Sequence, residues 1–373
     1  MNVLLFSIGL LYALLVVALY VGWKFTPIFP SPNGFSQKHA CVSIIVAMRN
    51  EEKNIGNLLT CLMHQQFTGQ MEVILVDDAS EDSSVAVANS FTAIFPCPLV
   101  VIPSEGVGKK AAIATGVRHA RFPLILTTDA DCQMGCHWVE TMVDALEQSG
   151  VKLITGIVAI EPTRDWLARF QAIETAALLG STAAFIAWNM PIMGNGANMG
   201  YWKEVFEQTG GYASSAEIAS GDDEFLIQQV HNHFRGSIKF VKHPEAIVLT
   251  SPQSSWQAVF MQRKRWAAKW RKKRPFRVWA TALLIGCFHL FWAAIPIFTI
   301  LFPTANILTI FAILMLKLAT EYLFLTAILK FTRQQKLLPY IGLLQLVYSH
   351  YAIWVGLHSL AGGYSWKGRY FVR

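Results

Sequence analysis

The sequence predicts an α/β protein: a doubly wound, mostly parallel sheet with an N-terminal transmembrane anchor and a C-terminal transmembrane helix bundle. Short apolar strand patterns alternate four times with helical patterns between residues 42 and 127, as in sheets with helices on both faces. Long apolar segments lie at both ends of the chain. Hydrophobic residues make up 53% and charged residues 15% of the chain, a balance that ordinary soluble domains do not show.

The first apolar segment covers residues 3–22 and carries no charge. At about 1.5 Å per residue its length matches the roughly 30 Å hydrocarbon layer of a bilayer. A cleaved signal peptide is the alternative, but no basic residue precedes the segment and no small-x-small cleavage site follows it. We therefore expect a retained anchor over residues 1–23.

A soluble domain is expected over residues 24–277. It ends in "RKRWAAKWRKKRPFR", and eight of the 31 lysines and arginines lie between residues 263 and 274. Basic residues beside a span mark the cytoplasmic side, so we expect an integral protein of a bacterial inner membrane with this domain in the cytoplasm. Lipid head groups are the nearest anions to these charges, which favours membrane lipids over nucleic acid as a partner.

Two to three C-terminal spans are expected within residues 278–363, from apolar segments at 278–302, 304–331 and 337–360. Lys317 and Glu321 lie four apart on the middle segment and would neutralise each other inside a bundle. If all three segments crossed, the basic tail over residues 364–373, with Lys367, Arg369 and Arg373, would lie outside, against the positive-inside tendency. A re-entrant segment at 304–331 would remove the conflict.

Within the soluble domain, each predicted strand is a short β-branched or apolar run. We expect strands at residues 42–47, 73–76, 99–102 and 124–127, and helices at 51–65, 83–91 and 110–119. An apolar stretch at 176–190 has 15 residues, too few to span. It fits either an interfacial helix or a core helix.

Acidic residues follow two of the predicted strands: Asp77 and Asp78 after the second, Asp129 and Asp131 after the fourth. The carboxyl ends of parallel strands meet at one edge, where these acids would repel each other unless a cation or a hydrogen-bond donor lies between them. Alternation along a strand would point Asp129 and Asp131 the same way. Their hard oxygens suit Mg²⁺ or Mn²⁺ shared with substrate phosphates.

Other ligands fit less well. The first strand is followed by no G-x-G-x-x-G, and "GVGKKAA" lacks the spacing of a Walker A loop. A zinc site at Cys132, Cys136 and His137 would lack a second ligand pair at a finger-like spacing. Asp residues are also common in turns and helix caps, although two converging clusters favour a ligand.

Seven motifs appear in the order typical of one enzyme family: "VSIIVAMRNEE", "VILVDDAS", "GKKAAI", "TTDADC", "GNGANMGY", "SGDDEFL" and "QRKRW". Residues 42–266 therefore resemble the membrane-bound family 2 glycosyltransferases, which have the GT-A fold. The resemblance implies an inverting, metal-dependent transfer of a sugar from a nucleotide-diphosphate sugar, with UDP the expected nucleotide. The implied acceptor is a lipid, a lipid-linked molecule or a glycan.

The resemblance also implies donor-site roles. Asp78 would accept a hydrogen bond from the nucleotide base beside Asp77. Lys109 would reach a phosphate, with Lys110 an equally charged neighbour. The other implied donor residues are Ala47, Asn50 and Glu51 at the nucleotide, and Asp129 and Asp131 as the D-x-D pair that holds Mg²⁺ or Mn²⁺ on the diphosphate.

On the acceptor side, the resemblance makes Asp223 the catalytic base and Asp222 its companion, although Asp222 also suits a helix N-cap. Gln262, Arg265 and Trp266 match the Q-x-x-R-W motif, near the acceptor and the pyrophosphate. A basic interfacial helix with Trp266 and Trp270 as anchors is the alternative, which we prefer for residues 271–274.

Three further functions fit parts of the sequence. Processive polysaccharide synthases also carry Q-x-x-R-W, but they secrete a chain through their own spans, and the few spans here favour a single transfer. A catalytically silent nucleotide-sugar-binding membrane protein would lack the acids that this chain carries. A small transporter built on the C-terminal bundle would not need acidic strand ends.

Overall fold

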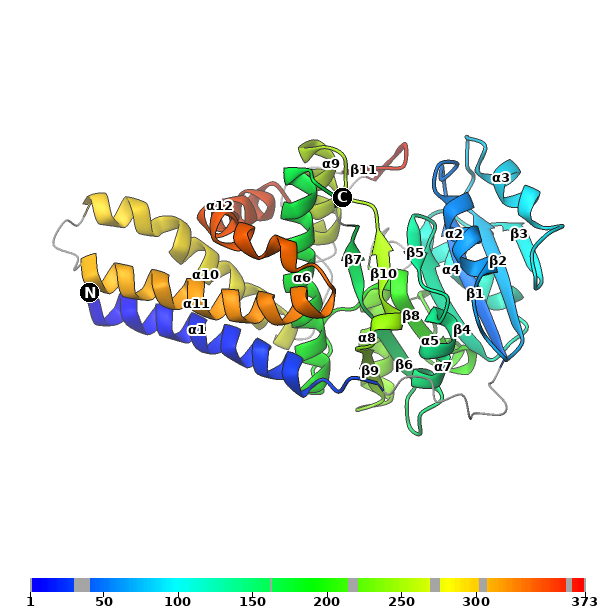
Figure 1. Cartoon of the computed structure of the whole chain (residues 1–373), viewed down its shortest axis with the longest axis horizontal. Helices are drawn as coiled ribbons and strands as arrows, with labels where there is room; N and C mark the ends of the chain where they lie inside the picture. Colours follow the sequence, from blue (N-terminus) through cyan, green and yellow to red (C-terminus); the bar gives the residue numbers. More distant parts are fainter. Residues whose placement is uncertain are drawn as a thin grey trace. The chain divides into compact units, whose positions relative to one another are not determined.

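The computed structural model describes residues 2–29, 41–161, 163–213, 221–268, 276–301, 307–359 and 364–371. Its contacts divide the chain into two units, which are shown in Figure 1. The sheet unit consists of residues 26–161 and 185–252, and the helical unit consists of residues 1–25, 162–184 and 253–373. Each unit is therefore built from segments that are not adjacent in sequence.

The sheet unit is organised around a seven-stranded sheet of order β3-β2-β1-β4-β8-β6-β9. Its strands are β1 (Val42–Met48), β2 (Met71–Asp77), β3 (Leu99–Pro103), β4 (Leu124–Asp129), β6 (Leu153–Gly156), β8 (Met199–Trp202) and β9 (Ile238–Val241). Only β8 runs against its neighbours. The prediction of a mostly parallel sheet is confirmed, and the four predicted strands correspond to β1 to β4.

Helices pack on this sheet, and the sequence predicts those near residues 51–65, 83–91 and 110–119. The helices are α2 (Ile55–Met63), α3 (Ser84–Phe91), α4 (Lys109–His119), α5 (Trp138–Leu146), α7 (Lys203–Gln208) and α8 (Asp222–His233). In α2 the apolar residues at helical spacing, Ile55, Leu58, Leu59 and Leu62, are all fully buried in the core of the sheet unit. On α4, Gly116 brings the helix so close to β1 that an added Cβ would lie 2.4 Å from Cγ2 of Ile45.

A second, three-stranded sheet determines how the D-x-D segment is held. It has the order β5-β10-β7, with β5 (Cys132–Met134), β7 (Val158–Ile160) and β10 (Val248–Thr250). Because β4 ends at Asp129 and β5 begins at Cys132, Asp131 lies in the turn between two sheets. The expectation that strand alternation aligns Asp129 with Asp131 was therefore wrong.

The helical unit contains α1 (Asn2–Phe25), α6 (Trp166–Ala187, up to Ala184), α9 (Trp256–Ala268), α10 (Phe276–Leu301), α11 (Ile307–Phe331) and α12 (Ile341–Ser359). A hairpin of β11 (Tyr364–Trp366) and β12 (Arg369–Phe371) follows. α1 and α11 run in parallel, because Gly9 packs on Ile313 and the ring of Trp23 meets that of Phe331 further along both helices.

Four described helices are long and apolar enough to cross a membrane: α1, α6, α10 and α11. The helix expected at 176–190 is longer than predicted, with 22 residues in α6. Figure 1 shows α6 running across the ends of α1 and α11 rather than alongside them. The expected segment at 337–360 is divided, since a 3-10 helix (Gln335–Tyr340) containing Pro339 precedes α12.

A polar cluster lies between the long helices. Lys317 pairs with Glu321 at 2.8 Å, as the sequence predicts, and also bonds to Gln345 of α12. Tyr12 of α1 donates a hydrogen bond to Glu321. α11 is thus one continuous helix, held to α1 and α12 by these bonds, and the structure does not support a re-entrant segment at 307–331. Trp270, residues 271–274, Thr304 and Arg373 lie outside the described residues.

Candidate active site

At the carboxyl edge of the seven-stranded sheet, the predicted acids lie at the ends of nearby strands. Asp129 at the end of β4 lies opposite Ala47 of β1, and Met48 of β1 lies opposite Asp77 at the end of β2. The two acidic strand ends therefore flank one strand, as expected for the carboxyl ends of neighbouring parallel strands. Asp77 accepts two hydrogen bonds from the backbone of Ser80, at 3.2 and 3.3 Å, which hold the turn after β2.

A lysine lies between the acids of two motifs. Nζ of Lys109, the first residue of α4, is 2.6 Å from Oδ1 of Asp129 and 3.4 Å from Oδ2 of Asp222. Burial alone would lower the pKa of Lys109, but these two carboxylates raise it far above its usual value. The ammonium group therefore stays protonated between Asp129 and Asp222. The sequence analysis had expected a cation or a hydrogen-bond donor between Asp129 and the acids after β2 instead.

The first turn of α8 presents the predicted base and its companion. Gly221 has a left-handed φ of 81° and precedes Asp222, which is the first helical residue and not an N-cap. Burial opposes the charge of Asp222, but Lys109 and Lys110 lower its pKa below the usual value. Asp223 is half-buried, and its Oδ1 accepts the backbone N–H of Glu224 at 2.8 Å. Three acids in the first turn also suit the positive end of the helix dipole.

The backbone of the "GNGANMG" segment packs closely against Asp222 and Lys109, a role that the sequence analysis missed. A Cβ added to Gly196 would lie 2.7 Å from Oδ2 of Asp222 and 3.5 Å from Nζ of Lys109. Asn198 is fully buried and donates to the carbonyls of Ile157 and Ala246. Two glycines around a polar, buried asparagine were the available signal, since such residues indicate close approach of backbone.

The loops after β1 and β2 are tied together where a nucleotide is expected. Asn50 has a left-handed φ of 51°, and its side chain accepts the backbone N–H of Glu81 at 2.9 Å. Glu51 is buried, and its backbone donates to Ser84 at 2.6 Å. Arg49, which the sequence analysis did not select, donates to the carbonyl of Asp78 at 2.8 Å. These bonds fix the backbone of the loops before any ligand is present.

Asp78 is more enclosed than the sequence suggested. Only 3% of it is exposed, and its Oδ1 accepts the backbone N–H of Gly108 at 3.0 Å. Gly108 has a φ of 93° and directly precedes α4. Asp78 thus connects the end of β2 to the loop that carries Lys109. Its role toward a nucleotide base stays a prediction.

The two carboxylates of the D-x-D pair are both partly exposed. Asp129 is 36% exposed at its side chain, whereas Oδ2 of Asp131 accepts a hydrogen bond from Thr250 of β10 at 3.3 Å. Among the described residues, no three His, Cys, Asp or Glu side chains form a ready-made metal site. Two partly exposed carboxylates fit a hard cation that takes its other ligands from water and substrate phosphates.

The predicted residues Gln262, Arg265 and Trp266 belong to α9 in the helical unit. Between them Arg263 forms a buried ion pair with Glu174 of α6, in which Nε and Nη2 lie 2.9 and 2.5 Å from Oε2. Arg263 also donates to Oε1 of Gln262 and lies 4.2 Å from the ring centre of Trp266. Arg263, which the sequence analysis did not select, therefore orients Gln262 and Trp266, which it did select.

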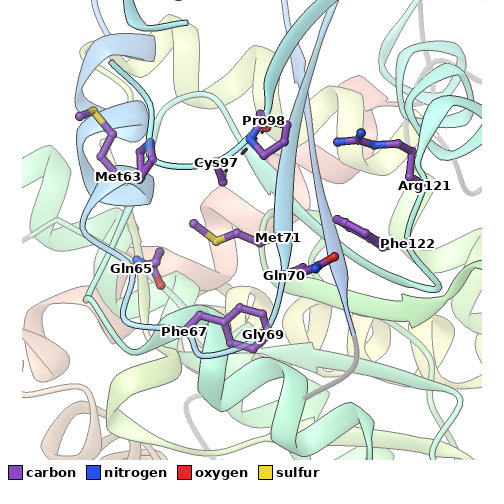
Figure 2. Close-up of a pocket in the computed structure, with 11 residues that line it drawn as sticks. Met63, Gln65, Phe67, Gly69, Gln70, Met71, Cys97, Pro98, Arg121 and Phe122 are labelled. Atoms are coloured by element: carbon purple, nitrogen blue, oxygen red, sulfur yellow. Dashed lines mark hydrogen bonds between the residues drawn. The ribbon is translucent and has the colours of Figure 1, made fainter. Parts of the chain in front are cut away.

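A cavity of about 570 Å³ opens at the opposite edge of the sheet, as Figure 2 shows. It is lined by residues just before the strands or at a strand's first position, among them Phe67, Met71, Cys97 and Phe122. Burial and the nearby Glu72 carboxylate raise the pKa of Cys97 to about 11, so its thiol stays protonated. Because parallel sheets bind ligands at the carboxyl edge, this cavity is not the candidate active site.

Residues 43–210 match the family model described as glycosyl transferase family 2. Glycosyltransferase AglE of Haloferax volcanii is 30% identical over 118 residues, which make up 31% of this chain and 39% of that protein. The 4,4'-diaponeurosporenoate glycosyltransferase of Staphylococcus aureus is 32% identical over 139 residues, 36% of each chain. The chain thus matches under two fifths of the length of these curated relatives.

Among solved structures, the mannosyltransferase PcManGT from Pyrobaculum calidifontis, in complex with GDP-Man and Mn²⁺, is similar with a TM-score of 0.58. The sequences are 19% identical, and the match covers 93% of this chain and 96% of that one. The likeness therefore extends beyond the sheet unit to the long helices. It confirms the predicted GT-A-like fold.

Proposed function

Because this chain belongs to glycosyl transferase family 2, we propose that it transfers a sugar, with inversion, from a nucleotide-diphosphate sugar to a lipid or lipid-linked acceptor. The observation that carries this proposal is the group of Asp129, Lys109 and Asp222 at the carboxyl edge of the sheet. Charged groups held this closely at the edge where parallel sheets bind ligands suit a diphosphate and its cation.

The donor half of the proposal uses the edge formed by β1, β2 and β4. Asp129 and Asp131 would hold Mg²⁺ or Mn²⁺, which would stabilise the negative charge that develops on the departing diphosphate. Asp77 and Asp78 would recognise the base, with UDP the expected nucleotide. The backbone of Ala47, Asn50 and Glu51 would line the nucleotide.

The acceptor half uses residues that the family resemblance selects. Asp223 would remove the proton of the acceptor hydroxyl, a step that typically contributes 10²–10⁴-fold in rate. Asp222 would stay ionised beside Lys109, because its pKa is lowered. Gln262, Arg265 and Trp266 would bind the acceptor and the pyrophosphate, with the ring of Trp266 fixed by Arg263.

The membrane placement that we propose has three crossings: α1, α10 and α11. Each exposes large apolar side chains along its length, such as Leu11, Leu283 and Phe311, which a lipid phase would cover. α6 would lie in the membrane interface instead. Its apolar window is 72% buried within the structure, against 17% for α1 and α10, so α6 has little surface left for lipid.

Three crossings place both the sheet unit and the basic tail on the cytoplasmic side of an inner membrane. Figure 1 shows that α10 leads away from α9 and that α11 returns beside α1. β11 packs against α9, which precedes α10, so the chain end returns to the side where α10 began. Lys367 and Arg369 then obey the positive-inside tendency.

The activity is tested with the full chain purified in detergent. UDP- and GDP-sugars are screened for thermal protection with and without Mn²⁺, and protecting donors are incubated with membrane lipid extracts to detect transfer. We expect protection that depends on Mn²⁺ and transfer that is lost in Asp131→Asn and Asp223→Asn. Absence of protection by every nucleotide sugar would overturn the proposed function.

The topology is tested in cells with single cysteines in a cysteine-free background. A membrane-impermeant maleimide should label a cysteine introduced between residues 302 and 306 and spare Lys367→Cys. Labelling of Lys367→Cys in intact cells would contradict three crossings.

A further inference from the structure

Lys109 is paired with Asp129, the carboxylate that the proposed function assigns to Mg²⁺ or Mn²⁺. Its Nζ lies 2.6 Å from Oδ1 of Asp129, one of the two carboxylates in the D-x-D pair. The second partner, Asp222, comes from α8, a helix more than ninety residues later in the chain. Gly196 closes the far side, since even a Cβ there would meet the Asp222 carboxylate at 2.7 Å.

The ion pair and a bound divalent cation cannot share Asp129 without cost. A lysine ammonium at hydrogen-bonding distance and a metal ion at coordination distance from one carboxylate would repel each other strongly in a partly buried site. Only 19% of the Lys109 side chain is exposed, so solvent screens this repulsion poorly. The lysine must therefore leave Asp129 when a metal ion binds there.

We propose that Lys109 is a resident counter-cation that holds Asp129 and Asp222 together in the donor-free enzyme and releases Asp129 only when a nucleoside diphosphate arrives. The phosphates give the ammonium group a new anionic partner, which compensates for the lost carboxylate. The divalent cation consequently binds together with the nucleotide rather than before it. This inference rests on the proposed function, because it assumes that Asp129 serves the metal.

The test measures Mn²⁺ binding to the full chain in detergent by electron paramagnetic resonance, with Mn²⁺ alone and with UDP or GDP. The wild type should bind Mn²⁺ weakly alone and at least about tenfold more tightly with the matching nucleotide. Lys109→Met should bind Mn²⁺ alone about tenfold more tightly than the wild type does, and the nucleotide should add less. Lys109→Gln is the substitute variant in case Lys109→Met folds poorly. It keeps a hydrogen-bond donor for the two acids and should show the same tighter binding of Mn²⁺ alone.

Lys110→Met is the matched control, because it removes the same charge one residue away. Nζ of Lys110 lies 4.3 Å from the ring centre of Phe225, a contact that Lys109 does not make. If both Lys109 variants bind Mn²⁺ without nucleotide no more tightly than the wild type does, the inference is overturned. It is also overturned if Lys110→Met gains as much Mn²⁺ affinity as the Lys109 variants do. No Mn²⁺ binding to the wild type even with nucleotide would instead overturn the proposed metal role of Asp129.

Discussion

Gly196→Ala tests whether the packing behind Asp222 matters for catalysis. The new Cβ would lie 2.7 Å from Oδ2 of Asp222, where ordinary contact begins at 3.4 Å. The carboxylate must therefore retreat by the difference, about 0.7 Å, or the backbone must shift by as much. Lys109 is already 3.4 Å from that oxygen, so the displacement would alter the ion pair and the start of α8.

We expect a loss of about 10- to 100-fold in kcat, since misplacement by about 1 Å has effects of this size. Overpacking should also lower the free energy of unfolding by about 1–3 kcal/mol. Sugar transfer at saturating donor measures the first effect, and denaturant unfolding measures the second. Lys109 and Asp223 are unchanged in this variant, so the loss would be geometric.

Gly56→Ala is the control, because its added Cβ would meet no atom closer than 3.8 Å. It lies on α2, where alanine should stabilise the helix by up to about 1 kcal/mol. Transfer rates should stay at the wild-type level. A Gly196→Ala protein with the kcat of the wild type would show that the site tolerates the shift and that the reasoning about Gly196 is wrong.

Three further predictions concern stability. Glu174→Ala strands the buried guanidinium of Arg263 and should destabilise the helical unit by about 3–5 kcal/mol in detergent, whereas Glu174→Leu combined with Arg263→Met should recover most of this. Burial would raise the pKa of Glu72, but hydrogen bonds from Ser43 and Arg121 lower it. Glu72→Gln should therefore be less stable than the wild type at neutral pH, and the difference should vanish as pH falls below about 4; a constant difference would contradict this. Gly116→Ala should cost about 1–3 kcal/mol in denaturant unfolding through its clash with β1, and an unchanged midpoint would show that α4 adjusts freely.

The sequence was sufficient where structure depends on local pattern. Buried parallel strands are continuous apolar runs, so β1 to β4 were located within two residues at each end. The alternation of these strands with helices then implied a shared carboxyl edge. Asp77 and Asp129 followed directly, since both close a strand.

Contacts between distant segments could not be predicted in this way. Lys109 was selected as a phosphate ligand, yet its partners Asp129 and Asp222 are 20 and 113 residues further along the chain. Strand alternation was extended to Asp131, beyond the predicted strand at 124–127, because nothing in "TTDADC" shows that β4 stops at Asp129 and a second sheet begins. Tertiary pairing decides such boundaries, and local propensity does not.

The discontinuous make-up of the helical unit has a consequence for biosynthesis. Every segment of the sheet unit precedes residue 253, so that unit can be completed while the ribosome is still translating the remaining third of the chain. In the topology that we propose, α1 enters the bilayer before α11, the helix on which its Gly9 packs, has been made. Chains interrupted before residue 307 should therefore carry an intact sheet unit, with α1 packed on α10 through Tyr12 but without α11.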